Sequence, residues 1–105
     1  MATPQRISSS ELRRLFNDLG YWEKACAGEF RQVVVKDRHP SPERSHQPIC
    51  TRSQMISYRD REDNEVARVH QYLRPDGTLG GSGKPDPKRL IHKGIVYFAG
   101  PSRRT

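Results

Sequence analysis

The sequence predicts an α+β domain, with a small, mostly antiparallel sheet of about four strands and one or two N-terminal helices packed on one face. Three observations favour this class. Apolar residues before position 28 recur at helical spacing, later segments alternate apolar and polar residues at strand spacing, and Pro, Gly, Asp and Asn mark the turns. A chain of 105 residues has room for one domain, 1–105, with a modest core.

Two helices are expected near the N-terminus. Ser10 is the expected N-cap of the first, and Glu11 lies in its first turn, where a negative charge opposes the helix dipole. An apolar stripe is formed by Leu12, Leu15, Phe16 and Leu19. Gly20 suits the position just after this helix, and residues 21–27 form a second short helix that ends at Gly28.

Four segments are expected to form the sheet. Three valines at the centre of 30–35 indicate a strand that is buried on both faces. Alternation resumes over 53–59, and the polar residues 61–64 form a loop of hairpin length that leads into the next strand, 66–74. A final strand over 95–98 follows a turn at His92-Lys93-Gly94.

The strand at 66–74 carries the clearest alternation. One face, directed to the core, holds Ala67, Val69, Gln71 and Leu73. The other face holds Val66, Arg68, His70, Tyr72 and Arg74. Pro75-Asp76-Gly77 then predicts a tight reversal, because Pro presets φ and Gly tolerates a positive φ.

The remaining segments are expected to be irregular. Residues 1–7 are polar and predicted to be flexible, and 101–105 are predicted to be frayed. The stretch 38–49 is rich in proline and reads as an exposed loop, either a simple connection or a holder of binding residues. Cys26 and Cys50 are too few for a disulfide framework, and whether they pair is left open.

Positive charge is concentrated in the C-terminal part of the chain. Residues 1–64 hold 11 Lys and Arg against 9 Asp and Glu, whereas residues 65–105 hold 8 against 3. A local cationic excess attracts polyanions, so nucleic acid is the leading partner class and an anionic membrane surface the second. The alternative is a solvated surface that only keeps the protein soluble.

Single-stranded nucleic acid is the specific form of this prediction. Alternate residues on a strand are spaced by about 6.6–7 Å, which is close to the rise per nucleotide of an extended single strand. Tyr72 could then stack on a base while neighbouring cations contact phosphates. The expected binding residues are Arg68, His70, Tyr72, Arg74, Lys84, Lys88, Arg89 and Lys93. An ordinary solvated sheet face, with Tyr72 covered by a helix, is the alternative.

The glycine-rich segment before the last strand allows further hypotheses. It does not match a phosphate-binding P-loop, because Thr78 occupies the position of the first glycine and Pro85 follows Lys84. A backbone anion site over 80–83, flanked by Lys84 and Lys88, or a plain flexible turn, both remain open. The segment Gly80–Lys88 could instead dock on a protein partner as part of an accessory factor.

Metal-independent RNA cleavage is the enzymatic alternative. It requires a general base, a general acid and a cation beside the phosphate. His70 could supply acid–base chemistry with Arg68, Arg74 and Lys84, or as a pair with His92. Small basic ribonuclease toxins are similar in size and residue type.

No metal site or cofactor is predicted. His39, His46, Cys50 and His70 could in principle converge on zinc, but no second paired ligand motif accompanies them. The sequence has no apolar run long enough for a membrane span and no secretory leader, so a cytoplasmic protein is expected.

One stretch resembles a known group of proteins. VARVHQYLRPDGTLGGSGKPDPKRL, residues 66–90, covers about a quarter of the chain and is similar to a signature of small uncharacterised prokaryotic proteins. The resemblance implies a bacterial or phage origin and carries no activity to these residues.

Overall fold

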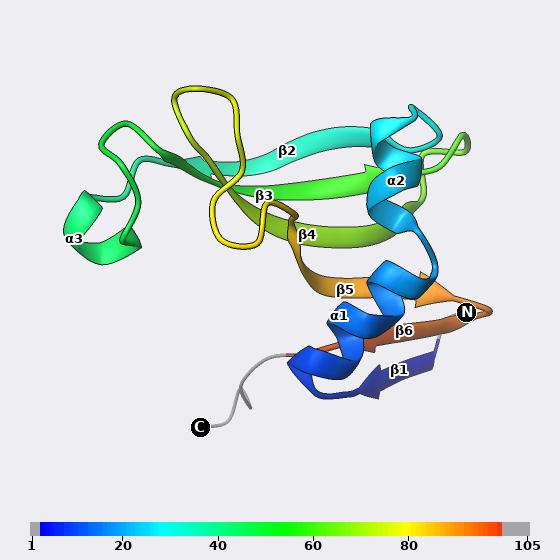
Figure 1. Ribbon diagram of the computed structural model, residues 1–105. Coiled ribbons are helices and arrows are strands. Elements are labelled where there is room, and N and C mark those ends of the chain that lie inside the picture. Colours follow the sequence, from blue (N-terminus) through cyan, green and yellow to red (C-terminus); the bar gives the residue numbers. More distant parts are fainter. Residues whose placement is uncertain (1–2, 100–105) are drawn as a thin grey trace.

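The computed structural model describes residues 3–99, which form three helices and six strands (Figure 1). In chain order the elements are β1 (Thr3–Arg6), α1 (Ser9–Asp18), α2 (Tyr21–Cys26), β2 (Arg31–Arg38), α3 (Pro42–Ser45), β3 (Arg52–Arg59), β4 (Glu65–Leu73), β5 (Asp86–His92) and β6 (Ile95–Phe98). The predicted α+β class is confirmed. The segment 101–105, predicted to be frayed, lies outside the described residues.

All six strands belong to one sheet in the order β1-β6-β5-β4-β3-β2. Neighbouring strands are antiparallel except for β1, which pairs in parallel with β6. The expected number of about four strands was too low, because β1 and β5 were missed. β1 has the sequence TPQR, within the segment predicted to be flexible, and shows no apolar alternation; its backbone pairing with the distant β6 makes it a strand.

The first helix begins two residues earlier than expected. Ser8, and not Ser10, is the N-cap: its Oγ accepts a hydrogen bond from the Glu11 backbone N–H, and the Glu11 carboxylate accepts one from the Ser8 backbone N–H. This reciprocal arrangement is a capping box, which satisfies two backbone donors at the helix start. Gly20, with φ of 69°, separates α1 from α2 as the sequence predicted.

The core lies between the helices and one face of the sheet (Figure 1). Leu12 and Phe16 of α1, with Tyr21 and Ala25 of α2, are buried against the strands. The strands contribute Ile56, Tyr58, Ala67, Val69 and Leu90. Because the chain crosses from the β1 edge to the β2 edge through α1 and α2, both helices cover the same face.

β2 corrects the expectation of a strand buried on both faces. It is an edge strand, and Val34 and Val35 are 51% and 39% exposed. The pairing with β3 is irregular between Val34 and Lys36, so Val35 is the extra residue of a bulge. The loop expected at 38–49 begins one residue late, since Arg38 is still in β2, and it contains the short helix α3 with Ser45 buried.

The face of the sheet opposite α1 and α2 is called here the open face. On β4 the core side chains are Ala67 and Val69, so Arg68, His70 and Tyr72 lie on the open face, as their alternation predicted. None of the helices in residues 3–99 has the length and apolar composition needed to cross a bilayer.

Candidate functional site

Strand register aligns polar side chains in rows across the open face. One row crosses all six strands and consists of Val33, Ser57, Arg68, Arg89, Phe98 and Arg6. A second row contains Lys36, Met55, His70 and Asp86. A third contains Arg38, Ser53 and Tyr72. Paired residues on neighbouring strands project to the same side, so these rows bring distant cations together.

Glu65 neutralises part of the first row. Its Oε2 accepts hydrogen bonds from Ser57 Oγ at 2.6 Å and from Arg68 Nη2 at 2.9 Å. Its Oε1 accepts from both Nε and Nη2 of Arg89. Burial raises the pKa of Glu65, but the hydrogen bonds from Ser57, Arg89 and Arg68 outweigh it and hold the pKa below its usual value. The Glu65 carboxylate therefore forms ion pairs with Arg68 and Arg89, two of the residues predicted to contact nucleic acid.

Two predicted lysines also have carboxylate partners. Lys88 Nζ lies 3.1 Å from Oδ2 of Asp86, and Asp86 Oδ1 accepts a hydrogen bond from Arg13 of α1 at 3.2 Å. Lys84 Nζ lies 3.5 Å from Oε2 of Glu23 on α2. These lysines are exposed, so their ion pairs are weak and exchange readily with solvent or a ligand.

Three predicted site residues lie away from His70. Arg74 follows β4, and its Nε donates to Gln47 Oε1 at 3.0 Å. His70 pairs with Asp86 at the start of β5, whereas His92 ends that strand six residues later, about 20 Å away at strand rise. Lys93 lies in the turn beyond His92. The structure thus does not bring His70 and His92 together as a catalytic pair.

His70 contacts a hydroxyl and an aromatic ring on the open face. Its Nε2 lies 2.7 Å from Ser53 Oγ on β3, and its ring meets Tyr72 edge-on with centroids 4.8 Å apart. Burial lowers the pKa of His70, Lys88 lowers it further, and Asp86 partly offsets both. These effects favour the neutral imidazole, which has one ring nitrogen that can accept a proton.

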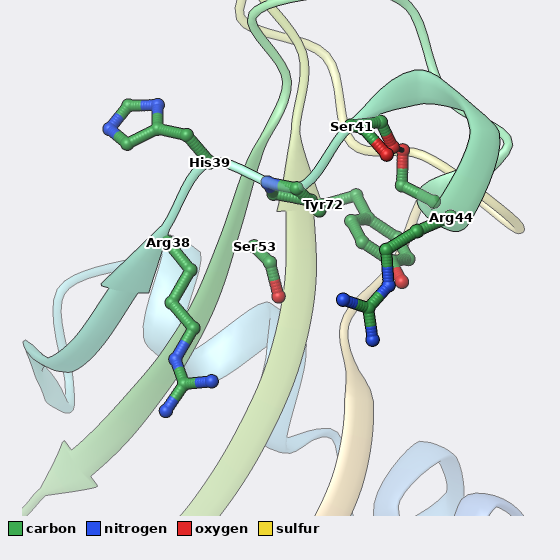
Figure 2. A pocket seen from close by; sticks show the side chains of 8 residues that line it. Arg38, His39, Ser41, Arg44, Ser53 and Tyr72 are labelled. Atoms are coloured by element: carbon green, nitrogen blue, oxygen red, sulfur yellow. Dashed lines mark hydrogen bonds between the residues drawn. The ribbon is translucent and has the colours of Figure 1, made fainter.

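A cavity of about 550 Å³ opens beside this histidine, between the third row and α3 (Figure 2). Figure 2 shows Ser53 between Arg38 of β2 and Arg44 of α3, with both guanidinium groups reaching toward the same side and Tyr72 beside Arg44. The lining residues are Arg38, His39, Pro40, Ser41, Arg44, Ser45, Ser53 and Tyr72, and none is a carboxylate.

The two arginines of this cavity differ from Arg68 and Arg89. Within residues 3–99, neither Arg38 nor Arg44 lies within ion-pair distance of an Asp or Glu side chain. Their charge is therefore available to an anion without first displacing an internal partner. The cavity therefore combines two arginines that have no acidic partner with a lining that contains no carboxylate.

Sequence reasoning missed Arg38, Arg44 and Ser53. Ser53 could have been found, because the predicted β3–β4 hairpin, continued in register, places it opposite Tyr72. Arg38 and Arg44 carried no such signal: both lie on the segment interpreted as a connecting loop, and only the structure shows that Arg38 at the end of β2 and Arg44 in α3 line the same cavity.

The glycine-rich segment packs beside the same region. The Gly80 backbone N–H donates to the Tyr72 carbonyl at 2.9 Å, and a Cβ at Gly80 would lie only 2.6 Å from Gln47 Oε1. The Gln47 side chain therefore packs closely against the Gly80 backbone, and a larger residue at position 80 would displace the Gln47 amide. A second cavity, of about 390 Å³, is lined by residues that include Ser82, Lys84, His70 and Arg13.

The candidate metal ligands and the two cysteines are placed as follows within residues 3–99. In the described part of the chain, no three His, Cys, Asp or Glu side chains are grouped as metal ligands, so the four candidate zinc ligands do not converge. Cys26 and Cys50 are both free and exposed.

Comparisons with protein-family models, curated proteins and solved structures found no match to this chain. What the protein does must therefore be inferred from its own residues.

Proposed function

We propose that the protein binds single-stranded nucleic acid, RNA or DNA, across the open face, with a backbone phosphate held between Arg38 and Arg44. The observation that supports this most directly is the cavity that these two arginines share with Ser53 and Tyr72 and with no carboxylate. A phosphate there receives charge-assisted hydrogen bonds from two guanidinium groups that have no competing acidic partner.

The first row supplies the rest of the binding surface. Arg6 lies over the Phe98 ring with its Cζ 5.6 Å from the centroid, so both sit at the edge of the open face formed by β1 and β6. Phe98 and Tyr72 are aromatic surfaces on which unstacked bases can lie, and each stacked base contributes about 1–3 kcal/mol. Lys36 adds a further cation in the row between them.

A duplex suits this surface less well than a single strand. Aromatic side chains stack on bases only where those bases are unpaired. The surface also offers separated phosphate contacts across several strands, so affinity depends on total charge more than on base sequence. We therefore expect weak sequence preference and strong salt dependence.

The decisive experiment is a binding titration of fluorescent oligouridylate and oligodeoxythymidylate at about 50 and 200 mM salt. The double variant Arg38→Ala/Arg44→Ala is compared with Arg31→Ala/Arg61→Ala, which removes the same charge near the opposite end of β2 and in the β3–β4 loop. The first pair should weaken binding at least about tenfold and lower the salt slope by about 0.7, because the contact to one phosphate is lost. Absence of binding by the wild-type protein at low salt, or equal losses in both double variants, would contradict the proposal.

Cleavage of bound RNA is a second candidate function, favoured by the 2.7 Å contact between His70 Nε2 and Ser53 Oγ. It retains His70 from the ribonuclease hypothesis without its pairing with His92. Incubation of total RNA with the wild-type protein and with His70→Asn tests it: fragmentation should require the histidine. Intact RNA at high protein concentration would remove this candidate.

A further inference from the structure

The Ser53–His70 pair opens onto the arginine cavity. Ser53 and His70 lie on the neighbouring antiparallel strands β3 and β4, two register positions apart, so their side chains meet diagonally on the open face. Ser53 also lines the cavity, and Figure 2 shows its hydroxyl between the guanidinium groups of Arg38 and Arg44. A hydroxyl in contact with a nitrogen base therefore faces two cations.

We propose that Ser53 is a nucleophile, that His70 is its general base, and that the substrate is a phosphodiester of the strand held by Arg38 and Arg44. This inference rests on the proposed binding of single-stranded nucleic acid. It goes further by predicting hydrolysis of both RNA and DNA, because the attacking oxygen comes from the protein and not from the ribose 2′-hydroxyl.

The first step transfers the nucleotide to the protein. His70 Nε2 takes the Ser53 hydroxyl proton while Oγ forms a bond to phosphorus. The bond from phosphorus to the leaving sugar oxygen breaks on the side opposite Oγ, so that oxygen takes a proton from water, and the imidazolium returns its proton to the solvent.

The second step restores the protein. His70 takes a proton from water, the water oxygen bonds to phosphorus, and the bond from phosphorus to Ser53 Oγ breaks. The proton then returns from His70 to Oγ. One water is consumed for each phosphodiester, which becomes a phosphomonoester and an alcohol, with no change of oxidation state.

The environment of His70 suits this role. Its lowered pKa, caused first by burial and then by Lys88, keeps the base form populated at neutral pH. Arg38 and Arg44 line the space where negative charge grows on the phosphoryl oxygens, and fixed cations there favour the transition state. A carboxylic ester, which is neutral, would gain less from two guanidinium groups, so the cavity favours a phosphodiester.

The test uses fluorophore-quencher oligonucleotides made entirely of ribose or entirely of deoxyribose, incubated with the full chain in the presence of EDTA to suppress contaminating metal-dependent nucleases. Wild-type protein should cleave both. Ser53→Ala and His70→Asn should each lose at least about 100-fold in rate, while Ser10→Ala, on the exposed start of α1, keeps the wild-type rate. Circular dichroism and thermal melting check that each variant folds.

Binding and covalent labelling separate the possible results. Ser53→Ala should still bind both oligonucleotides within about twofold of wild type, since the arginines remain. Acid-quenched wild-type reactions should yield a phosphorylated peptide containing Ser53. The inference would be overturned if the protein cleaves RNA but not DNA and Ser53→Ala still cleaves the RNA. That result would point to the ribose 2′-hydroxyl as the nucleophile. Bound but uncleaved oligonucleotides would overturn it while leaving the proposed binding intact, and absence of binding would remove both.

Discussion

Glu65 and Arg68 form an ion pair within β4, with Oε2 and Nη2 2.9 Å apart, although they are separated by three positions in a strand. Residues three apart in a regular strand face opposite sides of the sheet. The pairing with β3 moves from Ala67 opposite Tyr58 to Glu65 opposite Arg59, which leaves Val66 as a bulge residue. The bulge turns Glu65 to the open face, where it also binds Arg89.

Removing the Glu65 charge should strengthen nucleic-acid binding. Glu65→Gln keeps the size of the side chain and leaves Arg68 and Arg89 without their shared counter-ion, so the dissociation constant should fall severalfold at low salt. The free energy of unfolding should fall by about 1 kcal/mol, a modest cost because both arginines are partly exposed. Fluorescence titration and urea unfolding measure the two effects.

Asp63→Asn is the matched control. It removes the same charge from Asp63, which pairs with Arg31 and Arg59 near the β3–β4 loop. Equal strengthening of binding in both variants would mean that only net charge matters and that the open face is not the binding surface.

His70 should titrate below the usual histidine range. Burial and Lys88 lower its folded-state pKa beneath the value of 6.5 expected when unfolded. Between these two values the unfolded chain binds more protons, so the free energy of unfolding should fall as pH falls from above 6.5 and level off below the folded pKa. NMR titration of the imidazole gives the pKa directly, and Lys88→Gln should raise it. Lys93→Gln, in the distant β5–β6 turn, should leave it unchanged, and an unmoved pKa in Lys88→Gln would count against this placement of Lys88.

Two buried tyrosines should respond oppositely to loss of their hydroxyl. Within residues 3–99 the Tyr58 hydroxyl is buried with no hydrogen-bond partner, whereas the Tyr21 hydroxyl donates to the Ile91 carbonyl at 2.7 Å. Tyr58→Phe should leave the free energy of unfolding unchanged or raise it, because an unpaired polar group is removed. Tyr21→Phe should cost about 1 kcal/mol. Chemical denaturation compares them, and a larger loss in Tyr58→Phe than in Tyr21→Phe would show that Tyr58 has a partner in solution.

The capping box offers a test of where α1 begins. Ser8→Ala should lower the free energy of unfolding by about 1 kcal/mol, because it removes the hydrogen bond that the Glu11 N–H donates to Ser8 Oγ. Ser10→Ala, which changes the residue first expected to cap the helix, should change it by less than about 0.5 kcal/mol. Thermal melts measure both, and the reverse order would restore Ser10 as the cap.

Much of the fold could be predicted because its signals are local. Apolar spacing in Leu12, Leu15 and Phe16 placed α1, and a polar loop between two alternating segments placed the β3–β4 hairpin. The alternation of Ala67 and Val69 with Arg68 and His70 also followed from the two-residue period of a strand.

The errors at β1 and β2 have a common physical cause. β1 contains no pattern of its own and becomes a strand by pairing with residues more than 90 positions away. The valines of β2 are β-branched, which favours a strand, but their burial depends on having a neighbour on both sides, and β2 has one.

The sequence by itself determined the α+β class, the two N-terminal helices, the central hairpin and the excess of positive charge. The tertiary structure alone decided which cations have partners. A bulge at Val66 places Glu65 where it pairs with Arg68 and Arg89, and α3 places Arg44 in the same cavity as Arg38 and Ser53. Alternation and turn residues can be recognised within a few neighbouring positions of the sequence. The pairing of charges depends on strand register and on which distant segments become neighbours in the folded domain.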